Sequence, residues 1–328
     1  MQQERVHGVA RGWLPGAGAA GYDFGMLRSL LNNLFTGRPA QATPGADSTD
    51  LAREVALRFE RATAASKAGR AGEASAACRA VLEIAPNYWP AHHLLSTIEL
   101  PGEEYLRVLE RIHAHLQPRT YLEVGVLRGE SLRLVGAATR AIGVDPAPRV
   151  EFPLGPNVSV DARTSDDFFA ACDVRAELGG LPVDLAFIDG MHHFEFALRD
   201  FMNIEALCAP SSTILIHDAR PLNERTAARE RKTEFWSGDI WRLVLLLRKH
   251  RPDLVVRTIA AAPTGLAMVR NLHPGSTYIR DHLDALVAEF LAVEFGAFAA
   301  DRSDPLALVP NDWTQIRALL DAPVSSGR

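Results

Sequence analysis

The chain has 328 residues, of which 47% are hydrophobic and 23% are charged, and its formal net charge is −5 at pH 7. This composition is typical of a globular protein and excludes a collagen-like or largely disordered chain. The small acidic excess argues against a dedicated nucleic-acid-binding protein, which usually carries a basic face, so no nucleic acid is expected as a partner. At about 150 residues per domain, the length indicates roughly two domains.

The sequence also indicates in which cellular compartment the protein is found. No apolar run reaches the ~18 residues of a membrane span, and residues 1–25 lack the continuous apolar segment of a secretory signal. Cys78, Cys172 and Cys208 are too few and too scattered for a disulfide framework. Each lies in an apolar or Ala-rich stretch and is expected to be a buried, reduced thiol. We predict a cytoplasmic protein without a membrane span.

The first 117 residues divide into two segments. Residues 1–49 are rich in Gly, Pro and Ala and are expected to be flexible, with one short helix at 26–35 that docks on the body of the protein or on a membrane or partner. Residues 50–117 have helical periodicity and are predicted to form an α-helical cap. Ala74 and Pro86 have the spacing of a single tetratricopeptide unit, which is too little for a stable repeat array, although a peptide-binding groove is an alternative.

From residue 118 to residue 272, short β-rich runs alternate with helical stretches, which predicts an α/β domain with a mostly parallel sheet. A helix is expected over 130–139, after the first strand. The last two strands are joined by only four residues and must therefore be antiparallel. Residues 273–328 are predicted to add C-terminal helices. Seven strands are expected, at 120–124, 141–144, 157–160, 183–188, 213–216, 254–259 and 265–269.

The first two strands are followed by residues that suit a nucleoside ligand. Gly125 allows a tight turn, and Gly129 is expected to open a helix whose N–H groups attract an anion. The dinucleotide fingerprint needs a third glycine where this chain has Leu127, which argues against NAD. Asp145 follows the second strand, where a carboxylate can accept hydrogen bonds from ribose hydroxyls.

Acids and histidines follow the fourth and fifth strands. Asp189, His192 and His193 come after the fourth strand, and His217 and Asp218 come after the fifth. Consecutive strands are usually neighbours, so these groups are expected to converge at one edge of the sheet. Charged groups are rarely buried without a task, which predicts a catalytic site. His193 could equally be a polar residue at the start of a helix.

These motifs together resemble class I S-adenosylmethionine-dependent methyltransferases. They are Glu-Val-Gly-Val-x-x-Gly-x-Ser at 123–131, Gly-Val-Asp ending at Asp145, Ile-Asp-Gly-x-His at 188–192, and His217-Asp218. The group with this signature includes bacterial O-methyltransferases and cephalosporin-hydroxylase-like proteins. The resemblance covers about residues 118–270. It implies a Rossmann-like seven-stranded sheet with an antiparallel last strand, S-adenosylmethionine as cofactor, and O-methylation of a small-molecule acceptor such as a sugar or secondary metabolite.

The resemblance also implies roles for individual residues. The loop after the first strand would hold the methionine part of the cofactor, the acid after the second strand its ribose, and residues after the third strand its adenine, while Asp189 would face the methyl-transfer site. The cofactor-binding residues expected in this way are Glu123, Gly125, Gly129, Ser131, Asp145, Asp161, Ala162 and Asp189.

Catalysis needs a base for the acceptor hydroxyl, and His192 is the first candidate, because an unperturbed imidazole titrates near neutrality. His217 is the second candidate, and Asp189 would orient the base. Asp189 and Asp218 could alternatively hold a divalent metal. However, Ala219 stands where metal-dependent relatives have Asn or Asp, so a three-oxygen Mg²⁺ site is incomplete.

Other readings of the sequence remain open. His192, His217 and Asp218 could bind the metal of a non-haem metal oxygenase, although the glycine loop would then have no explanation. The helical cap could bind a protein while the domain acts only as a scaffold. Residues 225–241 contain several arginines and two tryptophans, and they form either a lid over the acceptor or a solvated loop. Assembly as a homo-oligomer is left open.

Overall fold

The computed structural model describes residues 46–324. The chain divides into two units, Met1–Ala52 and Arg53–Arg328, and the description below concerns the second unit. The helix predicted at 26–35 lies outside the described residues. Within residues 46–324, every helix is too short or too polar to cross a membrane.

Among the described residues, four helices precede the sheet, in two packing groups. They are α2 (Ala46–Lys67), α3 (Ala71–Ile84), α4 (Trp89–Glu99) and α5 (Tyr105–Leu116). The first three share a small core that includes Val55, Cys78 and Leu95. Helix α5 instead packs its buried residues into the core of the sheet. The helical cap predicted over 50–117 therefore contains three helices with a core of their own and a fourth that covers the sheet.

One eight-stranded sheet forms the centre of the molecule, in the order β3-β2-β1-β4-β5-β7-β6-β8. Strand β7 is antiparallel to β5 and β6, and the other strand pairs are parallel, so the predicted α/β fold with an antiparallel last strand in the seven-strand series is confirmed. The eighth strand has only two residues, too few to give a sequence pattern. The strands are β1 (Thr120–Val124), β2 (Arg140–Val144), β3 (Val158–Asp161), β4 (Val183–Ile188), β5 (Cys208–Ile216), β6 (Val255–Ile259), β7 (Leu266–Arg270) and β8 (Leu308–Val309).

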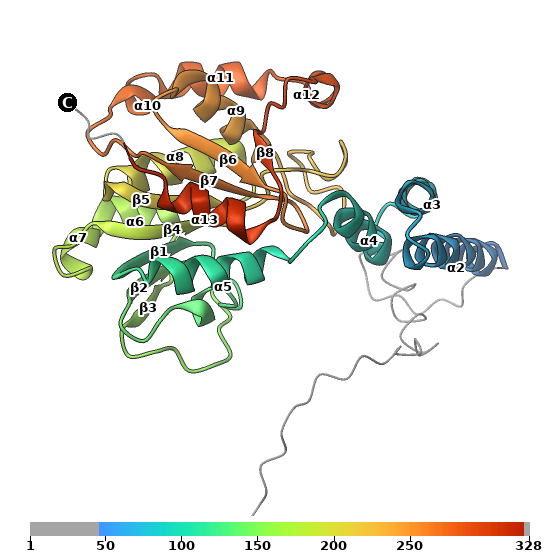
Figure 1. Ribbon diagram of the computed structural model, residues 1–328, viewed down its shortest axis with the longest axis horizontal. Helices are drawn as coiled ribbons and strands as arrows, with labels where there is room; N and C mark the ends of the chain where they lie inside the picture. Colours follow the sequence, from blue (N-terminus) through green and yellow to red (C-terminus); the bar gives the residue numbers. More distant parts are fainter. Residues whose placement is uncertain (1–45, 325–328) are drawn as a thin grey trace, which may run out of the picture. The chain divides into compact units, whose positions relative to one another are not determined.

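Helices cover both faces of the sheet, because successive side chains of each buried strand point to opposite faces. Leu122 and Ile188 belong to a core shared with α8, α9 and α11, whereas Tyr121 and Phe187 belong to a core shared with α5 and α13. Figure 1 shows α5 and α13 side by side on their face. The helices after the first strand are α6 (Ser165–Ala171), α7 (Val174–Glu177), α8 (Phe194–Glu205), α9 (Trp241–His250), α10 (Tyr278–Asp281), α11 (Leu283–Leu291), α12 (Phe295–Ala300) and α13 (Trp313–Asp321).

The prediction of a helix over 130–139 is wrong, because the structure has only a single 3₁₀ turn, η1 (Leu132–Leu134), in that segment. Val135 is already extended, and Gly136 disfavours continuation of a helix. The segment also packs tightly on the sheet, since a Cβ added to Gly143 would lie 2.6 Å from Val126 and 2.9 Å from Leu132. The anion-binding helix start expected after Gly129 is therefore absent from this loop.

The cysteines are free thiols, as predicted, but they differ in burial. Cys78 and Cys208 are buried, and burial raises the pKa of the Cys78 thiol to about 11. Cys172 is only partly buried, at the end of the short helix α6. The expectation of three buried thiols is therefore correct for two of them.

Candidate active site

The ends of β4 and β5 bring Asp189 and His217 together. Phe187 and Leu215 are aligned in the parallel pair, and both face the core shared with α5 and α13. Two residues further on, the same alternation places Asp189 and His217 on that face. The imidazole Nδ1 of His217 donates a hydrogen bond to Asp189 Oδ1 at 3.1 Å.

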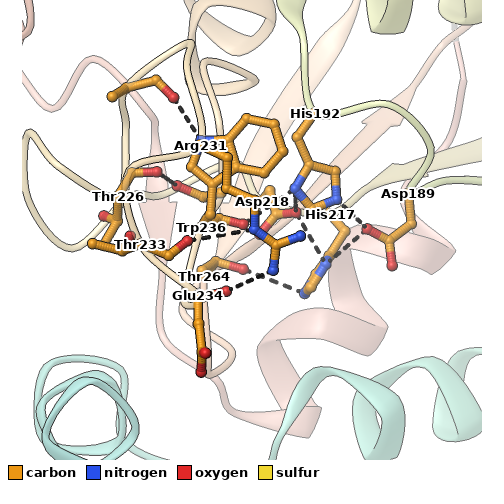
Figure 2. A network of polar contacts seen from close by, with 12 residues as sticks. Asp189, His192, His217, Asp218, Thr226, Arg231, Thr233, Glu234, Trp236 and Thr264 are labelled. Atoms are coloured by element: carbon orange, nitrogen blue, oxygen red, sulfur yellow. Dashed lines mark hydrogen bonds and ion pairs between the residues drawn. The ribbon is translucent and has the colours of Figure 1, made fainter. Parts of the chain in front are cut away.

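His192 and Asp218 complete the cluster (Figure 2). His192 Nδ1 lies 3.2 Å from Asp218 Oδ2, and its Nε2 lies 3.7 Å from Asp189 Oδ1. His217 Nδ1 is 3.6 Å from the same Asp218 oxygen. Asp218 is buried and has a left-handed backbone with φ +57°, so the chain turns sharply just after β5. The structure thus brings together four of the five groups that the sequence expected to converge, and only His193 lies apart from them.

The surroundings of His217 favour its protonated, positively charged form. Burial by itself lowers the pKa of its imidazole, but the carboxylates of Asp189 and Asp218 outweigh this effect and raise the pKa to about 9. A protonated imidazole at neutral pH has no lone pair with which to accept a proton. This argues against His217 as the general base and makes it a positive charge between two carboxylates.

His192 is held by the loop between β5 and α9. Its Nδ1 lies 3.2 Å from the carbonyl oxygen of Trp236, and the two rings are stacked with centroids 5.1 Å apart. Because a carbonyl only accepts hydrogen bonds, Nδ1 carries the proton. Nε2 is then the nitrogen whose lone pair is free in the neutral ring. This is the tautomer that a general base at Nε2 requires.

The same loop is fastened to the beginning of α8. Arg229 forms ion pairs with Glu195 and Asp239, and Asp239 Oδ1 accepts a hydrogen bond from Phe194 N at 2.7 Å. His193 lies outside the cluster of Asp189, His192, His217 and Asp218, with its Nε2 3.1 Å from the carbonyl oxygen of Arg229. The segment 225–241, expected as either a lid or a solvated loop, is thus anchored to the beginning of α8, and a role over the acceptor remains a prediction.

The two tryptophans of this loop region have different surroundings. Trp236 stacks on His192, and the Arg231 guanidinium lies 5.9 Å from the centre of the Trp236 ring. Trp241 is fully buried in α9 and stacks on Phe298. Of these two tryptophans, Trp236 therefore belongs to the site, whereas Trp241 packs in the core.

The glycine turn after β1 lies directly against the backbone of Asp189. Gly125 has φ +92°, and a Cβ added to it would lie 2.1 Å from the carbonyl oxygen of Asp189. Asp145 fastens this turn, because its Oδ2 accepts hydrogen bonds from Val126 N at 2.9 Å and Leu127 N at 2.8 Å. The predicted ribose contact of Asp145 remains a prediction. The structure adds that the same carboxylate organises the loop.

Glu123 and Ser131 are hydrogen-bonded to each other. Glu123 is fully buried, and its two oxygens accept hydrogen bonds from the Ser131 hydroxyl and the Tyr121 hydroxyl, each at 2.6 Å. Burial raises the pKa of the Glu123 carboxyl to about 8, although both hydroxyls act in the opposite direction. The side chains predicted to contact the cofactor therefore support the loop from within the core.

The raised pKa of Glu123 predicts a pH-dependent stability. In the native state this group keeps its proton up to about pH 8, whereas in the unfolded chain it ionises near its ordinary value of 4.5. Its contribution to stability is therefore complete below pH 4.5 and is lost as the pH rises toward 8. In Glu123→Gln, urea unfolding should lose less stability between pH 5 and pH 8 than in the wild type, by at least about 1.4 kcal/mol, which corresponds to one pKa unit.

The control for this experiment is Glu130→Gln, at an exposed position of the same loop. It should follow the wild-type curve. Parallel pH profiles for the wild type and Glu123→Gln would contradict the assignment of a protonated Glu123.

Asp161 and Ala162, the residues expected near adenine, lie at the end of β3. The Asp161 carbonyl oxygen accepts a hydrogen bond from Asp145 N at 3.1 Å, so the two acids are neighbours at one edge of the sheet. The Asp161 carboxylate forms an ion pair with Arg163, and the hydrogen bonds from Arg163 lower the pKa of Asp161. Their contact with a cofactor remains a prediction.

A divalent metal would also find ligands in this cluster. Asp189, His192 and Asp218 each offer one ligand atom, and these atoms lie within 4.8 Å of one another. Asp218 Oδ2 is buried and accepts no hydrogen bond from the described residues, although His192 Nδ1 and His217 Nδ1 lie 3.2 Å and 3.6 Å from it. One nitrogen and two oxygens suit Zn²⁺, Fe²⁺ or Mn²⁺ better than Mg²⁺. Ala219 is buried and adds no ligand.

Two groups at the site come from segments that the sequence analysis did not consider. Tyr105, at the start of α5, stacks on His217 with ring centroids 3.9 Å apart. Thr264, in the connection between β6 and β7, has its hydroxyl 3.4 Å from His217 Nε2. Both lie outside the motifs, and no spacing rule connects them to His217.

Comparison with known families agrees with this geometry. Residues 122–219, from β1 to the residue after Asp218, match a family model described as a methyltransferase domain. The matched segment contains the glycine turn, Asp145 and the cluster of Asp189, His192, His217 and Asp218.

Solved structures provide further similarities. Cofactor-bound Rv0187 from MTB is 18% identical with a TM-score of 0.40, and the match covers 51% of this chain and 79% of that chain. The O-methyltransferase TomG from Streptomyces achromogenes, in complex with SAM, is 16% identical with a TM-score of 0.40, covering 52% and 80%. The O-methyltransferase from Bacillus cereus, in complex with SAH, is 16% identical with a TM-score of 0.37, covering 52% and 83%. No curated protein matches the chain.

Proposed function

We propose that the protein is an S-adenosylmethionine-dependent O-methyltransferase that acts on a small-molecule acceptor. The observation that carries this proposal is the contact between Gly125 and the backbone of Asp189. This contact places the glycine turn, which suits a nucleoside cofactor, next to the cluster that contains the proposed base. One site therefore has the parts for both substrates of a methyl transfer, within a methyltransferase domain.

The residues present fit the cofactor. Gly125 and Gly129 have left-handed backbones, which glycine adopts without strain. Because glycine has no side chain, the loop carries none at these two turns. Asp145 and Asp161 lie side by side at the ends of β2 and β3, where ribose and adenine would be held. When bound, S-adenosylmethionine supplies the electrophilic methyl group, and the chain supplies position and proton transfer.

His192 would act as the general base. Its Nε2 would accept the proton of the acceptor hydroxyl, and its Nδ1–H would remain directed at the Trp236 carbonyl oxygen and Asp218. The buried Asp218 carboxylate would stabilise the imidazolium that forms. The positive His217 would balance the two carboxylates beside it. Holding the hydroxyl in line with the methyl group would supply much of the remaining acceleration.

A metal-assisted form of the same reaction is the second candidate, on the observation that Asp218 Oδ2 is buried without a hydrogen bond. A metal held by Asp189, His192 and Asp218 would polarise the acceptor oxygen. The oxygenase alternative would use similar ligands but would leave the glycine turn and Asp145 without a role.

The proposal is tested by calorimetry with S-adenosylmethionine and S-adenosylhomocysteine. We expect the wild type to bind both and Asp145→Ala to bind them about 10- to 100-fold more weakly, because hydrogen bonds to a charged group are lost. Asp173→Ala is the matched control, since Asp173 also accepts a backbone hydrogen bond, from Ala176 N, but on α7. Its affinity should equal that of the wild type.

Each arm of this experiment has a distinct meaning. Binding that weakens in EDTA would favour the metal-assisted form. A wild type that binds neither compound would refute the proposed function and would favour the oxygenase or the protein-binding scaffold.

A further inference from the structure

Helix α5 places one aromatic side chain at the catalytic edge of the sheet. Val108, Leu109 and Ile112 anchor this helix on the face to which Asp189 and His217 belong. Its first residue, Tyr105, donates a backbone hydrogen bond to the Ala262 carbonyl oxygen at 2.8 Å. The packing of α5 and this backbone hydrogen bond therefore hold Tyr105 in place. Tyr105 lies 17 residues before the segment that matches the methyltransferase family model.

The Tyr105 ring lies against the face of the His217 imidazole. The ring centroids are 3.9 Å apart, and the ring planes differ by 29°. The polar contacts of His217 lie at its edge, with Asp189 and Asp218 near Nδ1 and Thr264 near Nε2. The Phe187 ring is more distant and tilted, with centroids 6.3 Å apart and 53° between the ring planes. The edge contacts alone would let the imidazole tilt, whereas an aromatic ring on its face fixes the plane.

The Tyr105 hydroxyl does not hold the residue in place. It forms no hydrogen bond with any of the described residues, and it is not among their fully buried polar atoms. Burial, followed by the carboxylates of Asp189 and Asp218, raises its pKa, so the hydroxyl stays protonated. The contact with His217 therefore depends on the ring, and phenylalanine should preserve it.

We propose that Tyr105 is a positioning residue of the active site, whose ring keeps the His217 imidazole directed at Asp189 and Asp218. The helical segment that precedes the methyltransferase domain would then contribute directly to its catalytic centre. The positioning itself does not depend on the proposed function, but its effect on methyl transfer does.

Nuclear magnetic resonance of the histidine rings tests the positioning without any ligand. The His217 ring signals are identified by their loss in His217→Gln. In Tyr105→Leu these signals should move downfield, because the ring current of the stacked tyrosine is removed, and in Tyr105→Phe they should stay near their wild-type positions. Tyr278→Leu is the matched control, since Tyr278 stacks on His282 with centroids 4.6 Å apart and the same 29° between planes. It should move the His282 signals and leave those of His217 in place.

Two results would overturn the proposal. One is a His217 spectrum that does not change in folded Tyr105→Leu. The other, which needs no variant, is the absence of a nuclear Overhauser contact between the Tyr105 and His217 ring protons in the wild type. This second measurement decides the matter if Tyr105→Leu does not fold.

Methyl transfer gives a functional readout once an acceptor is found. In Tyr105→Leu, kcat should fall about 10- to 100-fold, because a misplaced catalytic group lowers the rate, while KM for the cofactor stays nearly constant. Tyr105→Phe should restore most of kcat. A loss confined to KM would overturn the proposal. A wild type that neither binds S-adenosylhomocysteine nor transfers methyl would refute the proposed function but would leave the resonance result valid.

Discussion

Replacing His192 by alanine is expected to lower turnover by about 10²- to 10⁴-fold, the usual contribution of a general base. The reason is geometric, since the Trp236 carbonyl oxygen and Asp218 both lie 3.2 Å from Nδ1 and leave Nε2 as the proton acceptor. Affinity for S-adenosylhomocysteine should change little, because the cofactor is expected to contact the glycine turn and Asp145. Methyl transfer to a panel of hydroxylated acceptors, with calorimetry in parallel, measures both quantities.

The neighbouring histidine supplies the control for this experiment. His193→Ala removes an imidazole that contacts the Arg229 carbonyl oxygen and lies outside the catalytic cluster. Its turnover should stay close to that of the wild type. Wild-type turnover in His192→Ala would remove His192 from the role of base, and equal losses in both variants would indicate a general disturbance of the loop.

Gly125→Ala is expected to reduce both stability and cofactor binding. The added Cβ would lie 2.1 Å from the Asp189 carbonyl oxygen, and the backbone at φ +92° is strained for any residue with a side chain. Strain of about 1–2 kcal/mol and overpacking of about 1–3 kcal/mol together predict a loss of roughly 2–5 kcal/mol in urea unfolding. Because the clash separates the turn from Asp189, S-adenosylhomocysteine binding should fall below detection.

Gly155→Ala is the matched control for the glycine turn. At Gly155 the added Cβ would meet only Val158, at an ordinary contact distance of 3.7 Å, and the backbone is not left-handed. Stability and binding should remain near wild-type values. Equal stability of Gly125→Ala and Gly155→Ala would show that the turn is looser than the structure indicates.

Local patterns predicted the parts of the fold that depend on neighbouring residues. The four-residue connection required an antiparallel hairpin, and β6 and β7 pair in that way. The order of strands β4 and β5 along the chain placed Asp189 and His217 at one edge, because consecutive strands became neighbours. The apolar runs of the buried strands were sufficient for both conclusions.

Contacts between distant segments could not be predicted in this way. The helix expected over 130–139 had suitable residues, but close packing of Leu132 on Gly143 and the break at Gly136 allow only one turn. The stack of Tyr105 on His217 joins residues 112 positions apart, and the Trp236 contact with His192 joins residues 44 positions apart. Both depend on how helices and loops pack on the finished sheet.

The attachment of the 225–241 loop has a consequence for redesign and for divergence. Exchanging this loop would remove Asp239 from Phe194 N and Arg229 from Glu195, as well as the carbonyl group that orients His192. A graft of this loop would therefore also disturb the contact that orients His192, the proposed base. Under the proposed function, changing the loop would alter proton transfer as well, so a productive loop transplant would have to carry the first turn of α8 with it.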